Sequence, residues 1–244
     1  MENPEDRYVK VGEINTRYWV LGRGSPLLLI HGLGASCEYW RYNVRALSQA
    51  FRVYAFDLPG FGRSDKRIED LSLDLAGEFV AAFLNAQGVD RASLVGNSLG
   101  GAVSLQFAVQ YPHRLEKLVL VSSGGLGREL GLSFRLLKIP FLGELMAWKW
   151  GTRPGMRLTL RSIVYEPQAM TDEFVDQMAE LARLPGLRRC SSQWPGWGST
   201  SEAKTWGPCN PSYVEFRRSR PPLSLSGALK TPSSPYPTPI WLIR

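Results

Sequence analysis

The sequence predicts an α/β protein with a doubly wound, mostly parallel sheet and a helical cap. Two observations support this prediction. Short apolar runs alternate with helical patterns between residues 8 and 125, and Gly-rich turns at 32–34, 60–62 and 96–101 each follow an apolar run. Strands that alternate with helices form parallel sheets with right-handed crossovers. Because ligands bind at the carboxyl ends of such strands, the three turns should share one functional edge of the sheet.

The apolar and helical patterns predict the elements of this core in order. The first two strands form a hairpin, the continuous apolar run 27–30 indicates a buried parallel strand, and 115–121 is expected to form another buried strand. The expected strands cover residues 8–11, 14–21, 27–30, 51–56, 92–95 and 115–121. The expected core helices cover residues 38–49, 71–87 and 99–111.

Composition divides the chain into three regions. Residues 1–125 form the expected core, residues 126–189 are rich in Leu, Met and aromatic residues and predict several helices, and residues 190–244 form a tail without periodicity. The family resemblance given below implies that the helices of 126–189 form a cap. The expected cap helices cover residues 132–137, 142–150, 156–163 and 171–184. Most cap aromatics should form the core of the cap, with one or two facing an apolar pocket; those considered are Phe134, Phe141, Trp148 and Trp150.

The central motif is Gly96-Asn97-Ser98-Leu99-Gly100, which lies between an expected strand and an expected helix. A G-x-S-x-G sequence in this context is typical of a nucleophile elbow, a sharp turn that lifts the serine hydroxyl above the sheet. Larger residues at the two glycines would collide with the neighbouring strand or helix. The N–H of the residue after the serine, at a helix N-terminus, points to where an oxyanion would form.

Three motifs together resemble the α/β-hydrolase fold family, in particular its esterases, lipases and hydrolases that cleave carbon–carbon bonds of ring-fission products. These motifs are His31-Gly32-Leu33-Gly34, the stretch 57–64 (Asp-Leu-Pro-Gly-Phe-Gly-Arg-Ser) and Gly96-Asn97-Ser98-Leu99-Gly100-Gly101. The resemblance implies that Ser98 is the nucleophile. It also implies that the backbone N–H groups of Leu99 and Leu33 form the oxyanion hole. The residues expected to support the elbow and the loop are Gly96, Asn97, Gly100, Gly101, His31, Gly32 and Gly34.

The sequence supplies no partner for this serine. A serine hydroxyl needs a general base, and a carboxylate must orient that base. The chain has only His31, which the resemblance assigns to bracing the loop, and His113, which falls beyond the far end of the elbow helix, roughly 20 Å from the serine at 1.5 Å per residue. Asp57 is also expected to brace a loop, and nothing marks Asp65 as catalytic. The base and the acid are therefore unassigned.

The tail from 190 to 244 departs from the rest of the chain. It holds nine of the seventeen prolines and four of the eight tryptophans. One hypothesis is a disordered low-complexity extension, so that the C-terminal strands and helix are missing or disordered. The other is a shifted reading frame, because the codons from 224 onwards, read in an offset frame, can encode a Trp-Gly-x-x-Asp strand that resembles the family's acid-bearing strand. Sequencing the gene would decide between the two.

Composition and charge limit the kinds of partner that the protein is expected to bind. The net charge is +7, of which residues 190–244 carry +4, and no basic stripe with aromatics appears elsewhere, so nucleic acid is not expected. The polar N-terminus and the absence of long apolar runs predict a cytoplasmic protein without a membrane span. Cys37, Cys190 and Cys209 are too scattered for a disulfide framework or a zinc site, and neither a metal nor a cofactor is expected.

Two functional hypotheses remain open. The first is a serine hydrolase by descent that cleaves an ester or a related carbonyl, or a carbon–carbon bond, in an apolar small molecule. Epoxide hydrolases and haloalkane dehalogenases are disfavoured because they use Asp where Ser98 stands. The second is a truncated pseudo-enzyme, or a binder of apolar ligands, that lacks the triad His and Asp. Neither hypothesis specifies an oligomeric state.

Overall fold

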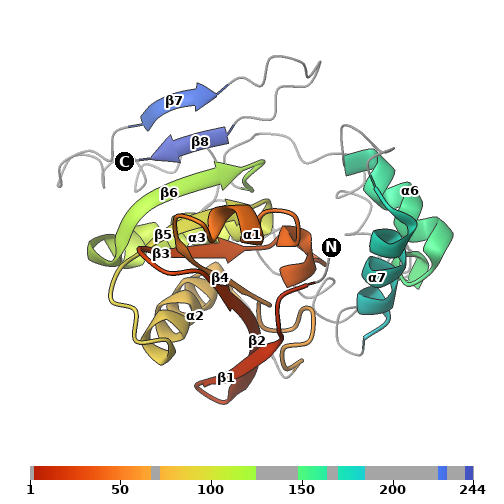
Figure 1. Cartoon of the computed structure of the whole chain (residues 1–244), viewed down its shortest axis with the longest axis horizontal. Coiled ribbons are helices and arrows are strands. Elements are labelled where there is room, and N and C mark those ends of the chain that lie inside the picture. Colours follow the sequence, from red (N-terminus) through yellow and green to blue (C-terminus); the bar gives the residue numbers. More distant parts are fainter. Residues whose placement is uncertain are drawn as a thin grey trace.

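The computed structural model describes residues 3–66, 72–124, 148–163, 170–184, 225–229 and 240–243. These residues form an eight-stranded mixed sheet with the order β1-β2-β4-β3-β5-β6-β8-β7 (Figure 1). The strands are β1 (Arg7–Val11), β2 (Ile14–Leu21), β3 (Pro26–Ile30), β4 (Arg52–Phe56), β5 (Ala92–Asn97), β6 (Leu115–Val121), β7 (Leu225–Leu229) and β8 (Ile240–Ile243).

The centre of the sheet is parallel, as the sequence predicts. Strands β4, β3, β5 and β6 run in one direction, while β1 and β2 form an antiparallel hairpin at one edge. Side chains of β3 are buried on both faces of the sheet, which explains its continuous apolar sequence. The predicted α/β class is confirmed, with a parallel centre in a sheet that is mixed as a whole.

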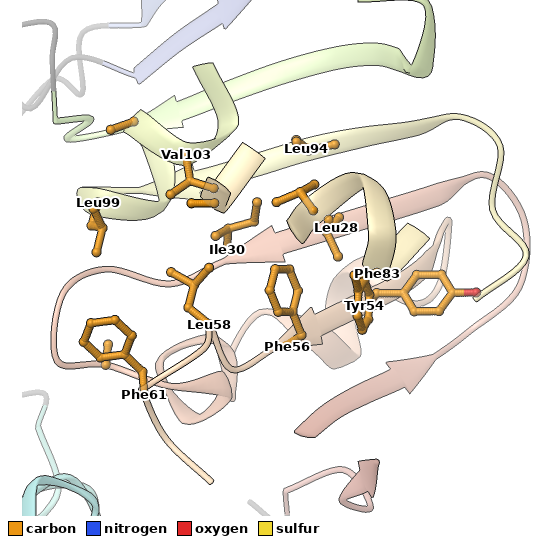
Figure 2. Close-up of a cluster of buried hydrophobic side chains, with 14 of the residues drawn as sticks. Leu28, Ile30, Tyr54, Phe56, Leu58, Phe61, Phe83, Leu94, Leu99 and Val103 are labelled. Carbon is orange, nitrogen blue, oxygen red and sulfur yellow. The ribbon is translucent and has the colours of Figure 1, made fainter. Parts of the chain in front are cut away.

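Helices cover the two faces of the sheet. The helical elements are η1 (Cys37–Trp40), α1 (Val44–Leu47), α2 (Leu73–Ala86), α3 (Leu99–Gln110), η2 (Pro112–Arg114), α6 (Arg153–Ile163) and α7 (Asp172–Arg183). Figure 2 shows the buried cluster on one face, where Phe56 of β4 stacks on Phe83 of α2 at 4.6 Å between ring centroids. On the other face, Trp40 and Val44 pack with Leu29 of β3. The alternating residues of β3 and β4 therefore contribute to two separate cores.

The prediction of one continuous helix over 38–49 is wrong. The chain forms the 3-10 helix η1, a turn at 41–43 and the single-turn helix α1 instead. In a 3-10 helix, residues three apart lie on the same side. This winding places both Cys37 and Trp40 against the sheet.

The tail contributes two short strands where it is described. β8 pairs antiparallel with β6, with Val121 opposite Ile240 and Leu118 opposite Ile243, and β7 pairs antiparallel with β8. The C-terminal strands of a doubly wound sheet would run parallel to β6, so these two strands do not take their place. The run Ile-Trp-Leu-Ile of β8 has high strand propensity, which suits pairing at an open edge.

The two described cap helices lie beyond one end of the sheet. The arrowheads of β3 and β6 point toward α6 and α7, which lie side by side (Figure 1). Thr171 caps α7 by accepting a hydrogen bond from the N–H of Phe174 at 3.2 Å. The predicted helices 156–163 and 171–184 correspond to these two elements. The predicted helix 132–137 and most of 142–150 lie outside the described residues.

Candidate active site

Ser98 occupies a sharp turn between β5 and α3. Its backbone has φ 53° and ψ −113°, a conformation that residues other than glycine rarely adopt. The N–H of Ser98 donates to the carbonyl of Val121 at 3.0 Å, and its carbonyl accepts from the N–H of Gly124 at 2.8 Å. The end of β6 therefore holds the turn in this strained conformation.

The glycines around Ser98 allow close contact between backbones. A Cβ atom at Gly96 would clash with the carbonyl of Gly100, and a Cβ atom at Gly100 would lie 2.6 Å from the carbonyl oxygen of His31. A Cβ atom at Gly101 would clash with the side chain of Ser123. These positions let the first turn of α3 pack directly on the end of β3.

The turn after β3 lies against the elbow. A Cβ atom at Gly32 would be 3.1 Å from Asn97 Oδ1 and 3.2 Å from the Cβ of Ser98, so the two turns are in contact. Gly34 has φ 70°, a left-handed conformation that favours glycine. Leu33 lies between these two glycines. Among the described residues, none accepts a hydrogen bond from its N–H or from the N–H of Leu99.

His31 is buried and uses both ring nitrogens. Nε2 accepts from the N–H of Leu58 at 2.9 Å, so the ring proton is on Nδ1, which donates to the carbonyl of Gly32 at 2.8 Å. Burial lowers the pKa of His31 below its ordinary value, which keeps the ring neutral. His31 therefore ties the turn after β3 to the turn after β4. His113 is exposed in η2, beyond the opposite end of α3.

A cavity of about 260 Å³ opens between the elbow and the cap. Most of its lining is apolar, as the sequence predicts for the pocket. Its walls are Gly32, Leu33, Gly34, Ala35, Tyr39, Asn97, Ser98 and Ser122 from the core and Trp150, Met156, Thr159, Leu160 and Met178 from the cap. Within the described residues, the lining contains neither histidine nor a carboxylate.

One cap aromatic faces this cavity. Trp150 lines it beside Gly34, whereas Trp148 is 53% exposed. Phe134 and Phe141 lie outside the described residues. A second link joins core and cap: Arg41, just after η1, donates to Glu173 at 2.9 Å and to Gln177 at 3.0 Å in α7. The cap helix is thus bonded to the segment that follows the turn after β3.

A charge cluster with a buried centre lies behind the same turn. We call it the Arg17 cluster; Arg17, Glu38 and Asp57 are its buried members, and Asp6 and Arg63 are partly exposed. Arg17 Nη1 and Nη2 bind the two carboxylate oxygens of Glu38 at 2.9 and 2.8 Å, and Nη1 binds Asp57 Oδ2 at 3.1 Å. Burial alone would lower the pKa of Arg17, but the hydrogen bonds that it donates to Glu38 and the charge of Asp57 raise it above its ordinary value. The guanidinium remains charged and compensates buried carboxylates from two loops.

Asp57 joins this cluster to the turn after β4. Its oxygens accept from the N–H of Cys37 and from the N–H of Arg63, both at 2.7 Å. Gly62 has φ 51°, and a Cβ atom there would clash with the carboxylate. Asp65 instead accepts from the N–H of Asn15 at 2.9 Å and so holds the hairpin. Both carboxylates are thus engaged in holding loops.

Sequence reasoning missed the Arg17 cluster. Asp57 and Gly62 belong to a recognisable turn motif, but Arg17 lies in a strand of alternating residues where an exposed side chain is the usual expectation. The signal in the sequence that could have indicated this cluster is an arginine followed two residues later by a tryptophan. In the structure both side chains donate hydrogen bonds to Asp6, and the tryptophan is buried.

The chain is similar to several known hydrolases. A family model described as alpha/beta hydrolase fold matches residues 25–149. The 2-hydroxy-6-oxo-2,4-heptadienoate hydrolase of Pseudomonas putida is 32% identical over 202 residues, which cover 78% of this chain and 67% of that protein. The solved structure of the 2-hydroxy-6-oxo-6-phenylhexa-2,4-dienoate hydrolase of Rhodococcus sp. strain RHA1 matches with a TM-score of 0.66 and 27% identity, over 84% of this chain and 75% of that one.

The chain also matches a part of longer proteins. An uncharacterized protein of Mycobacterium tuberculosis is 39% identical over 128 residues, which make up 52% of this chain and 38% of that protein. The chain therefore spans little more than a third of this relative. Within the described part of the chain, no helix is both long and apolar enough to cross a membrane.

Proposed function

The chain belongs to the alpha/beta hydrolase fold family, and we propose that it is a serine hydrolase by descent. The proposed substrate is an apolar small molecule with an ester or a related carbonyl, including a ketone whose carbon–carbon bond is cleaved. The observation that carries the proposal is the strained backbone of Ser98, at the cavity between the core and the cap. Such strain is retained where a residue must be held for chemistry.

The proposed reaction follows from the groups around the cavity. Ser98 Oγ attacks the substrate carbonyl, and the backbone N–H groups of Leu33 and Leu99 donate to the oxyanion that develops. The bond between the carbonyl carbon and the leaving group then breaks, and the leaving group departs with the proton that Ser98 Oγ loses. Water hydrolyses the acyl-enzyme, which releases the acid and restores the hydroxyl of Ser98. Gly96, Gly100 and Gly101 allow the close packing that this geometry needs, while Gly32, Gly34, His31 and Asn97 support the two turns.

A second candidate function is a pseudo-enzyme that binds an apolar ligand. One observation favours it: the described lining of the cavity offers no histidine and no carboxylate, and His31 has both nitrogens engaged. A serine without a base keeps the contribution of the oxyanion hole but loses several orders of magnitude in rate. The cavity would remain a binding site.

The experiment combines a fluorophosphonate probe with hydrolysis of a p-nitrophenyl ester. A serine hydrolase should be labelled, and Ser98→Ala should abolish both labelling and turnover. Ser122→Ala is the matched control, because Ser122 also lines the cavity with a positive φ of 47°. Absence of labelling together with saturable binding of an apolar fluorescent dye would favour the pseudo-enzyme. Labelling that survives Ser98→Ala would contradict the proposed nucleophile.

A further inference from the structure

A second hollow lies at the end of the sheet opposite to Ser98. It has a volume of about 450 Å³, and three of its lining residues are arginines: Arg7, Arg23 and Arg52. The remaining lining is Val20, Leu21, Gly22 and Gly24. β2 ends and β4 begins at this hollow, whereas the proposed active site lies where β3 and β5 end. The hollow is therefore separate from the cavity under the cap.

The fold brings these arginines together from three separate segments. Arg7 begins β1, Arg23 lies in the turn after β2, and Arg52 begins β4. β2 pairs with β1 on one side and with β4 on the other, which places the three around its C-terminal end. A count of charges along the chain does not reveal such a cluster, because its members are far apart in sequence.

The hollow carries an excess of positive charge. Among the residues that line it there is no carboxylate, and the nearest ion pair joins Arg7 to Glu5 at 3.7 Å, with both side chains more than half exposed. Like charges around one hollow repel each other, and an anion between them relieves that repulsion. The exposed pair with Glu5 contributes little and can be replaced by a ligand.

Two features limit the motion of this site. The guanidinium of Arg52 lies 5.4 Å from the centroid of the Tyr54 ring, in cation–π geometry. Gly22 and Gly24 have φ values of 80° and 104°, and a Cβ atom at Gly22 would clash with the backbone of Ser48 and Phe51. The turn that carries Arg23 is thus packed against the segment before β4, which reduces the entropy lost on binding.

We propose that this three-arginine hollow binds a phosphate group, either as inorganic phosphate or as a small phosphomonoester. The planar guanidinium matches phosphate oxygens with two parallel hydrogen bonds, so arginines that surround one hollow suit a dianion better than a halide. The proposal is independent of the chemistry at Ser98, because none of its residues lines that cavity.

The test is a titration of the full chain with inorganic phosphate at constant ionic strength, with chloride as the balancing ion. In a two-dimensional amide NMR spectrum, the signals of Gly22 and Gly24 should shift in a saturable way. A second arm uses a nucleoside monophosphate. Tighter binding of the monophosphate identifies a phosphomonoester as the ligand, and equal binding identifies the free anion. Shifts confined to other regions, or linear shifts without saturation, would overturn the proposal.

Charge-matched variants separate a site from general attraction to a basic protein. Arg23→Gln combined with Arg52→Gln should weaken phosphate binding at least about tenfold. The control combines Lys10→Gln with Arg161→Gln, which removes the same charge from exposed positions that do not line the hollow. Equal weakening in both double variants would show non-specific attraction and refute the site. All four side chains are exposed, and a thermal melt of each variant verifies that it is folded.

Discussion

The two sides of the 3-10 helix η1 differ sharply in charge. Glu38 turns into the Arg17 cluster, where every carboxylate is held by a guanidinium or by backbone N–H groups. Its neighbour Tyr39 lines the cavity, whose described walls hold no carboxylate and no histidine. The charged side thus holds backbone in place, whereas the cavity side presents Ser98, the nucleophile that we propose, among mostly apolar residues. The buried ion pairs therefore stabilise the loops around the cavity and do not line it.

The largest effect is expected from Arg17→Met, which tests whether the Arg17 cluster stabilises the fold. The substitution keeps much of the side-chain volume but leaves Glu38 and Asp57 buried without a counter-charge. Removing one partner of a buried ion pair costs about 3–5 kcal/mol. We expect a loss of that size in the free energy of unfolding measured by urea denaturation. Arg161→Met, at an exposed position in the cap, is the control, and an equal small effect of both would show that the cluster does not hold the scaffold.

A smaller effect should follow on the cavity side, from Gly100→Ala. The new methyl group would clash with the backbone of β3, which cannot move without disturbing the sheet, and such overpacking costs about 1–3 kcal/mol. The matched control is Gly77→Ala in α2, where the methyl group meets no backbone and contacts only the flexible side chains of Gln110 and Gln106. That control should be neutral or stabilise by up to about 1 kcal/mol, since alanine favours helix. Equal destabilisation of the two variants in urea would contradict the role of close backbone packing.

The smallest expected effect is the pH dependence of stability due to His31, which joins the turn after β3 to the turn after β4. Burial depresses its folded-state pKa below the ordinary 6.5, so the unfolded chain binds a proton more readily. Stability is therefore complete above pH 6.5 and declines as the pH falls from 6.5 toward the folded-state pKa, by at most about 1.4 kcal/mol per pH unit. Unfolding free energies between pH 5 and 7.5 measure this slope. His31→Gln should flatten it, and His113→Gln, at an exposed position, should leave it unchanged.

Much of the core follows from the sequence. Runs such as 27–30 are apolar without interruption, which is typical of a buried parallel strand, so strand positions were predicted within a few residues. The sharp turn at Ser98 could be predicted because a side chain at Gly96 or Gly100 would clash with neighbouring backbone. Patterns of this kind depend on neighbours in the chain, which a sequence displays directly.

Features built from distant residues could not be predicted. The Arg17 cluster joins the segment before β1, a strand, a 3-10 helix and the turn after β4, and the three-arginine hollow joins two strands and a turn. The prediction of one helix over 38–49 was wrong for the same reason. Burial of Cys37 and Trp40 against the sheet outweighed the helical periodicity of the segment. The roles assigned to Ser98, Leu33 and Leu99 remain predictions until the labelling experiment is done.

The backbone of Ser98 has a consequence for the stability of the whole chain. A residue other than glycine at φ 53° and ψ −113° carries a cost of roughly 1–3 kcal/mol, whether or not a base is present to exploit it. Since natural proteins are only marginally stable, this is a sizeable fraction of the folding free energy. A chain selected for stability alone would gain by replacing this serine with glycine. The turn thus places a cost in stability on the residue that we propose as the nucleophile.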